Sequence, residues 1–508
     1  MFVRTYGAAS RGVDVLPVSV ELRSGRGIQF HVAGMSGSLA RDAFLRIRGA
    51  LQAGGWAWPR EALTVSLSPG HASLHPEDLD LPLALVVLAQ IGAIPPTTLP
   101  HLCSVGSLGL DGSLRGHPTG AHAALAAAEA GCRATLVPAE VLPASSGSGP
   151  DAPVYGARNL REVVDHLTGA RPLPRWVHRA QAASAEPEVP LNRLHGDEHH
   201  LRGVLLAAAG EHHVLMLGSP GTGKSLSARA LHGILPALDR AESQTLRRLH
   251  AAKGLIRPDP WEPPLRSPHA GSGVAALIGS RAGGRHQVDG GAAFLPGELS
   301  LAHRGLLILD ELPEWSRPAM ETLRIPLERG VVDLARAAGS IQLPARCLVA
   351  ATANPCPCGY FMDAERRCRC TPAQVRNYLK RLSGPLIDRF PIHLETRVAP
   401  APANPEQWEW PTEAAAARAL VQRVRQADRS NVPWTEAAES CLRQGMRRWR
   451  LSGRAQTSLR QVAETHALCL ERHHVDEEDA AIALQYRVFD RAGWLESAWS
   501  AERPKHRG

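Results

Sequence analysis

The stretch His213–Ser225, with the sequence HVLMLGSPGTGKS, decides the fold of the centre of this 508-residue chain. Its first part, His213–Leu217, is apolar and of the length of a short buried strand. Its second part fits the pattern GxxxxGK[ST], and a helix is expected to begin at Leu226. Glycines let backbone N–H groups turn inward around phosphates, and the helix N-terminus adds partial positive charge. The sequence therefore predicts a nucleotide site made of Gly218, Ser219, Pro220, Gly221, Thr222, Gly223, Lys224 and Ser225.

The lysine of this motif is stronger evidence for a nucleotide site than it would be in most chains. The chain has only four lysines, at positions 224, 253, 380 and 505, and nearly all its positive charge is arginine. A chance match in a glycine-rich chain is the alternative, but it becomes rare when lysine is so scarce. We expect Lys224 to reach the β- and γ-phosphates of ATP and the Ser225 hydroxyl to coordinate Mg²⁺.

Two further strands are expected to end in polar residues that complete this site. Gly305–Leu309 (GLLIL) is apolar and runs into Asp310 and Glu311. Asp310 would hold the metal, and Glu311 would act as general base on the attacking water. An acidic turn without chemistry is the alternative. Cys347–Ala353 (CLVAATA) ends in Asn354, which can orient that water.

Composition shifts divide the chain into segments. Residues 1–170 alternate expected strands (Val15–Arg23, Leu63–Ser68, Ala134–Val137) with helices (Leu81–Ile94, Ala121–Ala130). Residues 192–398 alternate apolar strands with helical stretches, which predicts a parallel sheet with crossover helices. Residues 412–495 are helical, and Pro433, the loop Leu451–Gly453 and an N-cap at Asp476 predict four helices. Residues 171–191 and 399–411 are expected linkers, and residues 496–508 an expected tail.

Composition also bounds the setting of the protein. The net charge of +8 favours a polyanionic partner such as nucleic acid, although a soluble basic enzyme would explain it nearly as well. No apolar run is long enough to span a membrane, so we expect no membrane partner. The N-terminus lacks the pattern of a secretory signal, and nine cysteines are unevenly placed for a disulfide scaffold. These features predict a cytoplasmic protein.

Four of the cysteines form a CxC…CxC pattern. Cys356 and Cys358 are followed, after a polar loop, by Cys368 and Cys370. Four thiolates on one short excursion can close a tetrahedral site for a structural Zn²⁺, although CxC is tighter than the usual CxxC. An unliganded thiol cluster and redox-sensitive pairs are the alternatives.

Several longer strings resemble the ComM/YifB family of magnesium-chelatase-like AAA+ ATPases. They are RSPHAGSG (266–273), PGELSLAHRGLLILDELPEW (296–315), ATANPCPCGYF (351–361) and YLKRLSGPLIDRF (378–390). The resemblance covers nearly the whole chain. It implies an α/β fold with a P-loop AAA+ core (192–398), an N-terminal α+β Lon-protease-like domain of S5 type (1–170) and a C-terminal helical lid (412–495). It also implies a homohexameric ring that acts as a DNA motor, promoting branch migration in natural transformation.

The resemblance assigns roles to three site residues. Asn354 matches the sensor 1 position, Arg389 in SGPLIDRF the arginine finger supplied in trans, and Arg454 in LSGRA the sensor 2 acting in cis. Each arginine read alone would be a surface charge. In the N-terminal domain, the serine nucleophile and lysine base of Lon-type proteolysis fall on Leu83 and near His122, so we expect no peptidase activity.

In such a ring, two insertions could reach DNA in the pore. One spans Leu265–Phe294 and carries Arg266, Arg281 and Arg285; the other is an expected hairpin at Val331–Leu343 with Arg336 near its tip. Glycine and arginine together suit a loop that follows phosphates, and a solvated loop is the alternative. The competing functions are a metal-insertion motor, an ATP-dependent unfoldase or protease, and a scaffold whose ATPase governs ring assembly.

Overall fold

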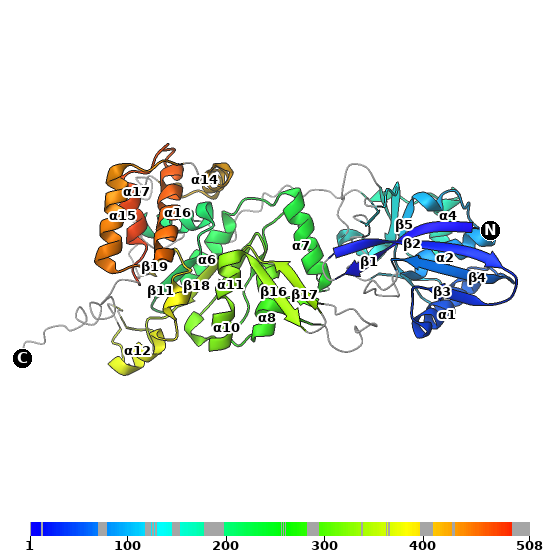
Figure 1. Ribbon diagram of the computed structural model, residues 1–508, viewed down its shortest axis with the longest axis horizontal. Coiled ribbons are helices and arrows are strands. Elements are labelled where there is room, and N and C mark those ends of the chain that lie inside the picture. The colour runs from blue at the N-terminus through cyan, green and yellow to red at the C-terminus, as the bar shows by residue number, and fades with distance from the viewer. Residues whose placement is uncertain are drawn as a thin grey trace, which may run out of the picture.

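A computed structural model describes the chain as three arrays of elements that follow one another along its longest axis (Figure 1). An N-terminal sheet lies at one end, a parallel sheet in the middle, and a group of helices at the other end. The residues described are 2–11, 14–69, 79–116, 123, 126–127, 130–144, 153–176, 191, 198–253, 255, 257, 259, 261–281, 294–336, 339–361, 363, 366–396, 410–428 and 432–489.

The N-terminal sheet has eight strands in the order β10-β9-β8-β5-β1-β2-β4-β3. Its strands are β1 (Phe2–Arg11), β2 (Asp14–Gly25), β3 (Phe30–Ala33), β4 (Ala62–Ser68), β5 (Leu102–Ser104), β8 (Ala134–Pro138), β9 (Val154–Ala157) and β10 (Arg175–Trp176). The long β1–β2 hairpin and β4 pair antiparallel, and β5, β8 and β9 continue the sheet in parallel. The expected strands at Val15–Arg23, Leu63–Ser68 and Ala134–Val137 are confirmed. Most of the expected helix Ala121–Ala130 lies outside the described residues.

Helix α2 (Asp80–Gln90) is buried almost throughout, which suits a helix that is apolar on every face. Asp80, at its first turn, is fully buried and needs partners there. Arg46 of α1 (Gly37–Ala53) provides them, donating from Nε and Nη2 over 2.6 and 3.0 Å, and the Leu108 N–H donates over 3.1 Å. This buried ion pair ties α1, α2 and β6 (Ser107–Leu108) together.

The central sheet is parallel throughout, with the strand order β12-β15-β18-β11-β19. Its strands are β12 (Leu265–Arg266), β15 (Leu306–Leu309), β18 (Leu348–Ala353), β11 (Val214–Gly218) and β19 (Ile392–Thr396). The three strands expected from sequence are confirmed as β11, β15 and β18. Since parallel strands share one carboxyl edge, residues that follow β11, β15 and β18 are brought to the same side.

Helices cover both faces of this sheet. One buried cluster combines Met216 and Ile308 with α5 (Glu198–Gly210) and α6 (Lys224–Gly233). The other combines Leu215 and Leu307 with elements between α7 (Arg240–Ala252) and α13 (Gly384–Ile387). These include α8 (Val274–Ile278), α9 (Glu298–Leu301), α10 (Arg317–Thr322), α11 (Arg324–Arg329) and α12 (Pro372–Leu379). The result is a three-layer α/β core.

The C-terminal helices are α14 (Ala414–Gln426), α15 (Glu436–Trp449), α16 (Gly453–Cys469) and α17 (Glu477–Gln485). All four expected helices are therefore present, and Asp476 caps α17 as expected. Their apolar faces join the same buried cluster as α5 and α6. The helical group is thus packed onto one face of the central sheet.

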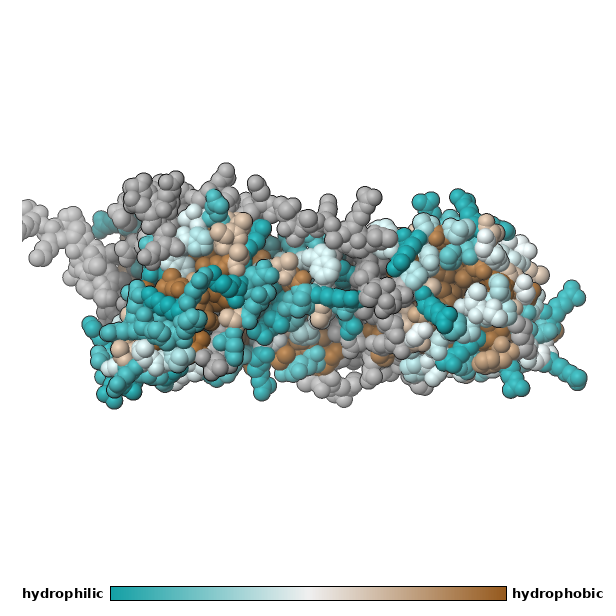
Figure 2. All heavy atoms as spheres, turned by 90° about the horizontal axis from the view of Figure 1, so that it is seen from above, coloured by the Kyte–Doolittle hydropathy of each residue, from teal (hydrophilic) through white to brown (hydrophobic). Residues whose placement is uncertain are grey.

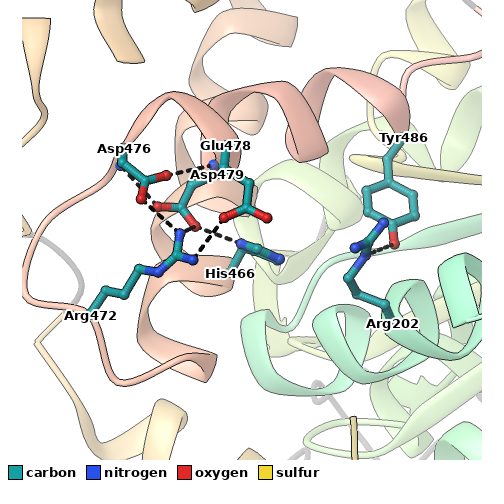
Figure 3. Close-up of polar contacts among 7 residues, drawn as sticks. All are labelled: Arg202, His466, Arg472, Asp476, Glu478, Asp479 and Tyr486. Carbon is teal, nitrogen blue, oxygen red and sulfur yellow. Dashed lines mark hydrogen bonds and ion pairs between the residues drawn. The ribbon is translucent and has the colours of Figure 1, made fainter. Parts of the chain in front are cut away.

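Two polar networks hold α17 in place (Figure 3). The Tyr486 hydroxyl donates to the His199 carbonyl over 2.9 Å and accepts from Arg202 Nε over 3.2 Å, which anchors the end of α17 to α5. Buried Asp479 accepts from Arg472 and lies 2.6 Å from His466 Nδ1. Because Asp479 is fully buried, these partners satisfy a charge that would otherwise destabilise the fold.

Figure 2 shows apolar atoms exposed in separate areas, over the N-terminal sheet and among the C-terminal helices, with hydrophilic side chains around them. Within the described part of the chain, every helix is too short or too polar to cross a lipid bilayer.

Candidate nucleotide site

The loop between β11 and α6 has the backbone that phosphate binding requires. Gly221 and Gly223 adopt positive φ angles of 84° and 86°, which a residue with a Cβ rarely tolerates. The loop is closed by Thr222, whose hydroxyl donates to the Ser219 carbonyl over 2.9 Å. It also lies 2.8 Å from the hydroxyl of Thr396, at the end of β19. The carboxyl ends of two neighbouring strands therefore fix the loop.

Lys224 folds back over this loop. Its Nζ donates to the carbonyls of Gly218 and Ser219 over 2.7 and 2.9 Å and to Asn354 Oδ1 over 3.3 Å. Burial lowers the pKa of Lys224 from 10.5 to about 8, and the charges of Asp310 and Glu311 only partly offset this effect. The ammonium is therefore held where removal from water disfavours its charge, and an added anion would favour it.

The acidic pair lies directly beyond β15. The Thr352 hydroxyl of neighbouring β18 donates to Asp310 Oδ1, and the Glu311 N–H donates to the same hydroxyl over 3.0 Å. Trp315 Nε1 donates to the Asp310 carbonyl over 3.0 Å. Sequence reasoning missed Thr352, which is buried and orients both acids. Its position near the end of the strand that runs into Asn354 was the signal available.

Glu311 has φ 50° and ψ 50°, the left-handed region that non-glycine residues rarely adopt. Such strain concentrates at functional sites, where surrounding contacts enforce it. Here the enforcing contact is the hydrogen bond from its N–H to Thr352. Among the described residues, none donates a hydrogen bond to the Glu311 carboxylate, which is exposed at the edge of the sheet.

The Ser225 hydroxyl faces the Asp310 carboxylate at 3.4 Å from each oxygen. A hydroxyl and a carboxylate are hard oxygen donors of the type that Mg²⁺ prefers when it also binds phosphates. The residues present thus fit a Mg²⁺·nucleotide, and the structure brings Lys224, Ser225, Asp310 and Asn354 together as the sequence suggested.

Arg389 and Arg454 occupy a different place. Arg389 Nη2 lies 2.7 Å and Arg454 Nη2 3.2 Å from opposite oxygens of Glu328, at the end of α11. The Arg389 side chain is 8% exposed and the Arg454 side chain 53%. Glu328, which joins them, was not foreseen from sequence, because nothing local links it to either arginine.

Both arginines line a cleft of about 840 Å³ at the amino edge of the central sheet. His213, Gly305 and Pro391, which immediately precede β11, β15 and β19, line the same cleft. A five-residue strand separates this edge from the P-loop by roughly 15 Å. The structure therefore does not bring Arg454 to the P-loop of its own chain, where a sensor acting in cis would lie. Arg454 instead shares the partner Glu328 with Arg389.

The four cysteines of the CxC…CxC pattern converge. The Sγ atoms of Cys356, Cys358 and Cys368 are 3.4 to 3.7 Å apart, and all four ligand atoms lie within 4.8 Å of one another. Cys356 is buried and the other three are partly exposed.

Two of the four arginines expected to meet DNA, Arg281 and Arg336, lie on paired strands of the core. The expected hairpin at Val331–Leu343 is present as β16 (Val331–Arg336) and β17 (Gly339–Pro344), with Arg336 opposite Gly339 at its end. Arg281 ends β13 (Gly279–Arg281), which pairs with β14 (Phe294–Pro296), and Arg285 lies outside the described residues. Arg266 instead forms a two-pronged ion pair with Glu298, at 2.6 and 2.9 Å.

The position expected for a protease nucleophile is Leu83, in the middle of α2 and fully buried. An aliphatic side chain at this place cannot attack a peptide. His122, the expected counterpart of the lysine base, lies outside the described residues.

A glycine-rich phosphate loop follows β11, an acidic pair follows β15, and an asparagine follows β18, the strand between those two. This arrangement defines an AAA+ P-loop protein. Residues 190–403 match the family described as magnesium chelatase, subunit ChlI, and residues 18–141 match subunit ChlI of Mg-chelatase. The chain is 32% identical to the uncharacterized protein YifB of Escherichia coli, over 95% of this chain and 96% of that one. It is 32% identical to the competence protein ComM of Haemophilus influenzae, over 83% and 81%.

A more distant similarity is to the magnesium-chelatase 38 kDa subunit of Rhodobacter capsulatus, 28% identical over 35% of this chain and 53% of that one. The chain belongs to the YifB/ComM family of magnesium-chelatase-like AAA+ proteins. This family is consistent with ATPase activity and with ATP and Mg²⁺ as ligands.

Proposed function

We propose that this protein is a Mg²⁺-dependent ATPase in which each residue at the carboxyl edge of the central sheet has a separate task. Lys224 exchanges its two carbonyl partners for the phosphates of ATP. Ser225 and Asp310 would hold Mg²⁺, which would neutralise charge on the phosphate oxygens. Glu311 accepts a proton from the attacking water, and Asn354 orients that water. The observation that carries this proposal is the convergence of Lys224, Asp310 and Asn354 on one edge.

The arginines serve a neighbouring copy of the chain. In a head-to-tail ring, one surface of each subunit meets a different surface of the next. The carboxyl edge of the central sheet would carry the negative phosphates, and the amino edge of the same sheet in the next subunit carries arginines. The two edges are therefore complementary in charge. Arg454, half-exposed, would reach the neighbour's γ-phosphate, and the more buried Arg389 would support it through their shared partner Glu328. We propose a hexamer, and therefore a trans role for both arginines.

The substrate we propose is single-stranded or branched DNA, moved by the ring during integration of incoming DNA in natural transformation. Three observations support it: the net charge of +8, two hairpins on the core that carry arginines, and a relative named as a competence protein. Arg281, Arg285 and Arg336 are the proposed DNA contacts, because Arg266 is committed to Glu298. We place this activity in the cytoplasm.

A branch-migration assay on a synthetic four-way junction tests the proposal. The wild type should move the branch point with ATP and Mg²⁺, and both Lys224→Ala and Glu311→Gln should be inactive. Glu311→Gln should still bind ATP, since it keeps the phosphate loop and the metal ligands. Lys253→Ala is the matched control, since Lys253 pairs with Glu298 away from the site. An ATPase that hydrolyses normally and never moves the junction would refute the DNA assignment.

The second candidate is the ATPase subunit of a metal-inserting chelatase, which the two family matches favour. The two functions differ in what stimulates turnover. DNA should raise the rate of ATP hydrolysis if the protein is a DNA motor, whereas a chelatase subunit would be indifferent to it. Proteolysis is disfavoured by Leu83, and degradation of casein by the pure protein would overturn that reading.

A further inference from the structure

The four-cysteine cluster has the dimensions of a tetrahedral metal site. Zn–S bonds of about 2.3 Å set the edges of a ZnS₄ tetrahedron at about 3.8 Å. The three Sγ–Sγ separations among Cys356, Cys358 and Cys368 are 3.4, 3.7 and 3.6 Å, close to this value and far longer than a disulfide bond. Cys370 completes the set within 4.8 Å.

The surrounding backbone suits thiolates. The Phe361 N–H donates to Cys356 Sγ over 3.3 Å, and the Cys370 N–H donates to Cys368 Sγ over 3.4 Å. Hydrogen bonds of this kind stabilise negative charge on sulfur and orient the ligand. On the inner side, Cys358, Cys368 and Cys370 pack against the apolar cluster that contains Phe361 and Tyr378. The four thiols therefore lie between the apolar core and the surface.

The segment that carries the four cysteines also contacts the nucleotide loop. Cys356 lies two residues after Asn354, and the turn that follows it brings Gly359 against Pro220. Gly359 has φ +85°, and a Cβ there would lie 2.7 Å from two carbons of the Pro220 ring. A proline ring cannot move aside as a flexible side chain can, so the two turns fit only because residue 359 is glycine.

We propose that Cys356, Cys358, Cys368 and Cys370 bind one structural Zn²⁺, and that the closed loop braces the P-loop through the Gly359–Pro220 contact. A d¹⁰ ion with four protein ligands and no open position has no role in the chemistry. Its effect is mechanical: it ties Cys356 to Cys368 and Cys370, which immediately precede α12. The site itself is independent of the proposed function, and only the bracing effect rests on nucleotide binding by the P-loop.

Metal analysis of the full-length protein tests the site. Protein purified without chelator should hold one zinc per chain and titrate nine thiols after denaturation with a chelator. Cys358→Ser and Cys370→Ser, both at partly exposed positions, should lose zinc, and Cys441→Ser in α15 should retain it. Replacement by Co²⁺ should give the ligand-field spectrum of a tetrahedral tetrathiolate. Five thiols with no metal would mean two disulfides, and bound iron or an empty reduced cluster would equally overturn the proposal.

Nucleotide affinity tests the bracing effect separately. Gly359→Ala should keep its zinc while weakening binding of a non-hydrolysable ATP analogue by about tenfold or more, because a Cβ 2.7 Å from the Pro220 ring must displace the P-loop. Gly25→Ala is the control, because Gly25 ends β2, has no left-handed φ, and has no heavy atom within 4 Å of the added Cβ. Zinc retained with unchanged affinity would refute the bracing effect and leave the metal site standing. Wild-type protein that binds zinc without binding nucleotide would instead refute the proposed function.

Discussion

Nucleotide affinity should fall steeply as the pH rises above 8, because the Lys224 ammonium is partly buried. In the free protein its pKa is lowered to about 8 by burial, so its ammonium is mostly present at pH 7 and mostly lost at pH 9. A bound triphosphate favours the charged form and restores the pKa toward its ordinary value. Binding above pH 8 must therefore take up a proton, and each further pH unit costs about a factor of ten in affinity.

The magnitude follows from the fraction of charged lysine. Between pH 7 and pH 9 that fraction falls from about nine-tenths to about one-tenth, so the Kd should rise roughly tenfold. Phosphate groups titrate near pH 6 and contribute little in this range. The loss is expected on raising the pH, and no loss is expected on lowering it from 8 to 7.

Isothermal titration with a non-hydrolysable ATP analogue and Mg²⁺ measures both the Kd and the number of protons taken up on binding. At pH 9, heats in two buffers of different ionisation enthalpy should report uptake of about 0.9 proton per nucleotide. Lys253→Ala should show the same slope, because its ammonium lies at Glu298. A Kd that stays constant from pH 7 to pH 9, without proton uptake, would refute the account of Lys224.

Two further predictions concern buried polar contacts. Thr352→Val should slow ATP hydrolysis about tenfold or more, because hydrogen bonds to charged groups are worth about 1.5–3 kcal/mol. Thr352→Ser keeps the hydroxyl and should retain most of the rate. Wild-type turnover in the valine variant would show that Asp310 and Glu311 need no orientation by Thr352. Asp80→Asn should lower the free energy of unfolding of the N-terminal region by about 3 kcal/mol, because it removes the buried carboxylate charge that balances the Arg46 guanidinium. Glu21→Gln, which removes an exposed pair, should cost less than about 1 kcal/mol, and a similar urea midpoint for both variants would contradict this reasoning.

The sequence predicted the parts of the site that local patterns determine. The phosphate loop follows from glycine spacing and a single lysine, and the strands before Asp310 and Asn354 follow from short aliphatic runs. The convergence of four cysteines was likewise predictable, since tight CxC pairs on one excursion have few ways to lie apart.

Contacts between distant segments could not be predicted in this way. Thr352 orients Asp310 only because β18 lies beside β15, and the sequence of neither strand predicts the order of strands in the sheet. Arg454 stands at a helix start, as expected, but its position beside Arg389 depends on how α16 packs on the sheet. The cis assignment came from the family resemblance of the LSGRA motif, and a motif does not say which edge of the sheet a helix start faces.

The central claim is that each active site is shared, with Lys224 from one subunit and Arg454 from the next. Mixing two inactive variants, Lys224→Ala and Arg454→Ala, tests it most directly. In an equimolar mixed ring, about a quarter of the interfaces would join an intact phosphate loop to an intact arginine, so about a quarter of wild-type ATP hydrolysis should return. If mixed rings form and no activity returns, the two residues act within the same subunit and the account is contradicted.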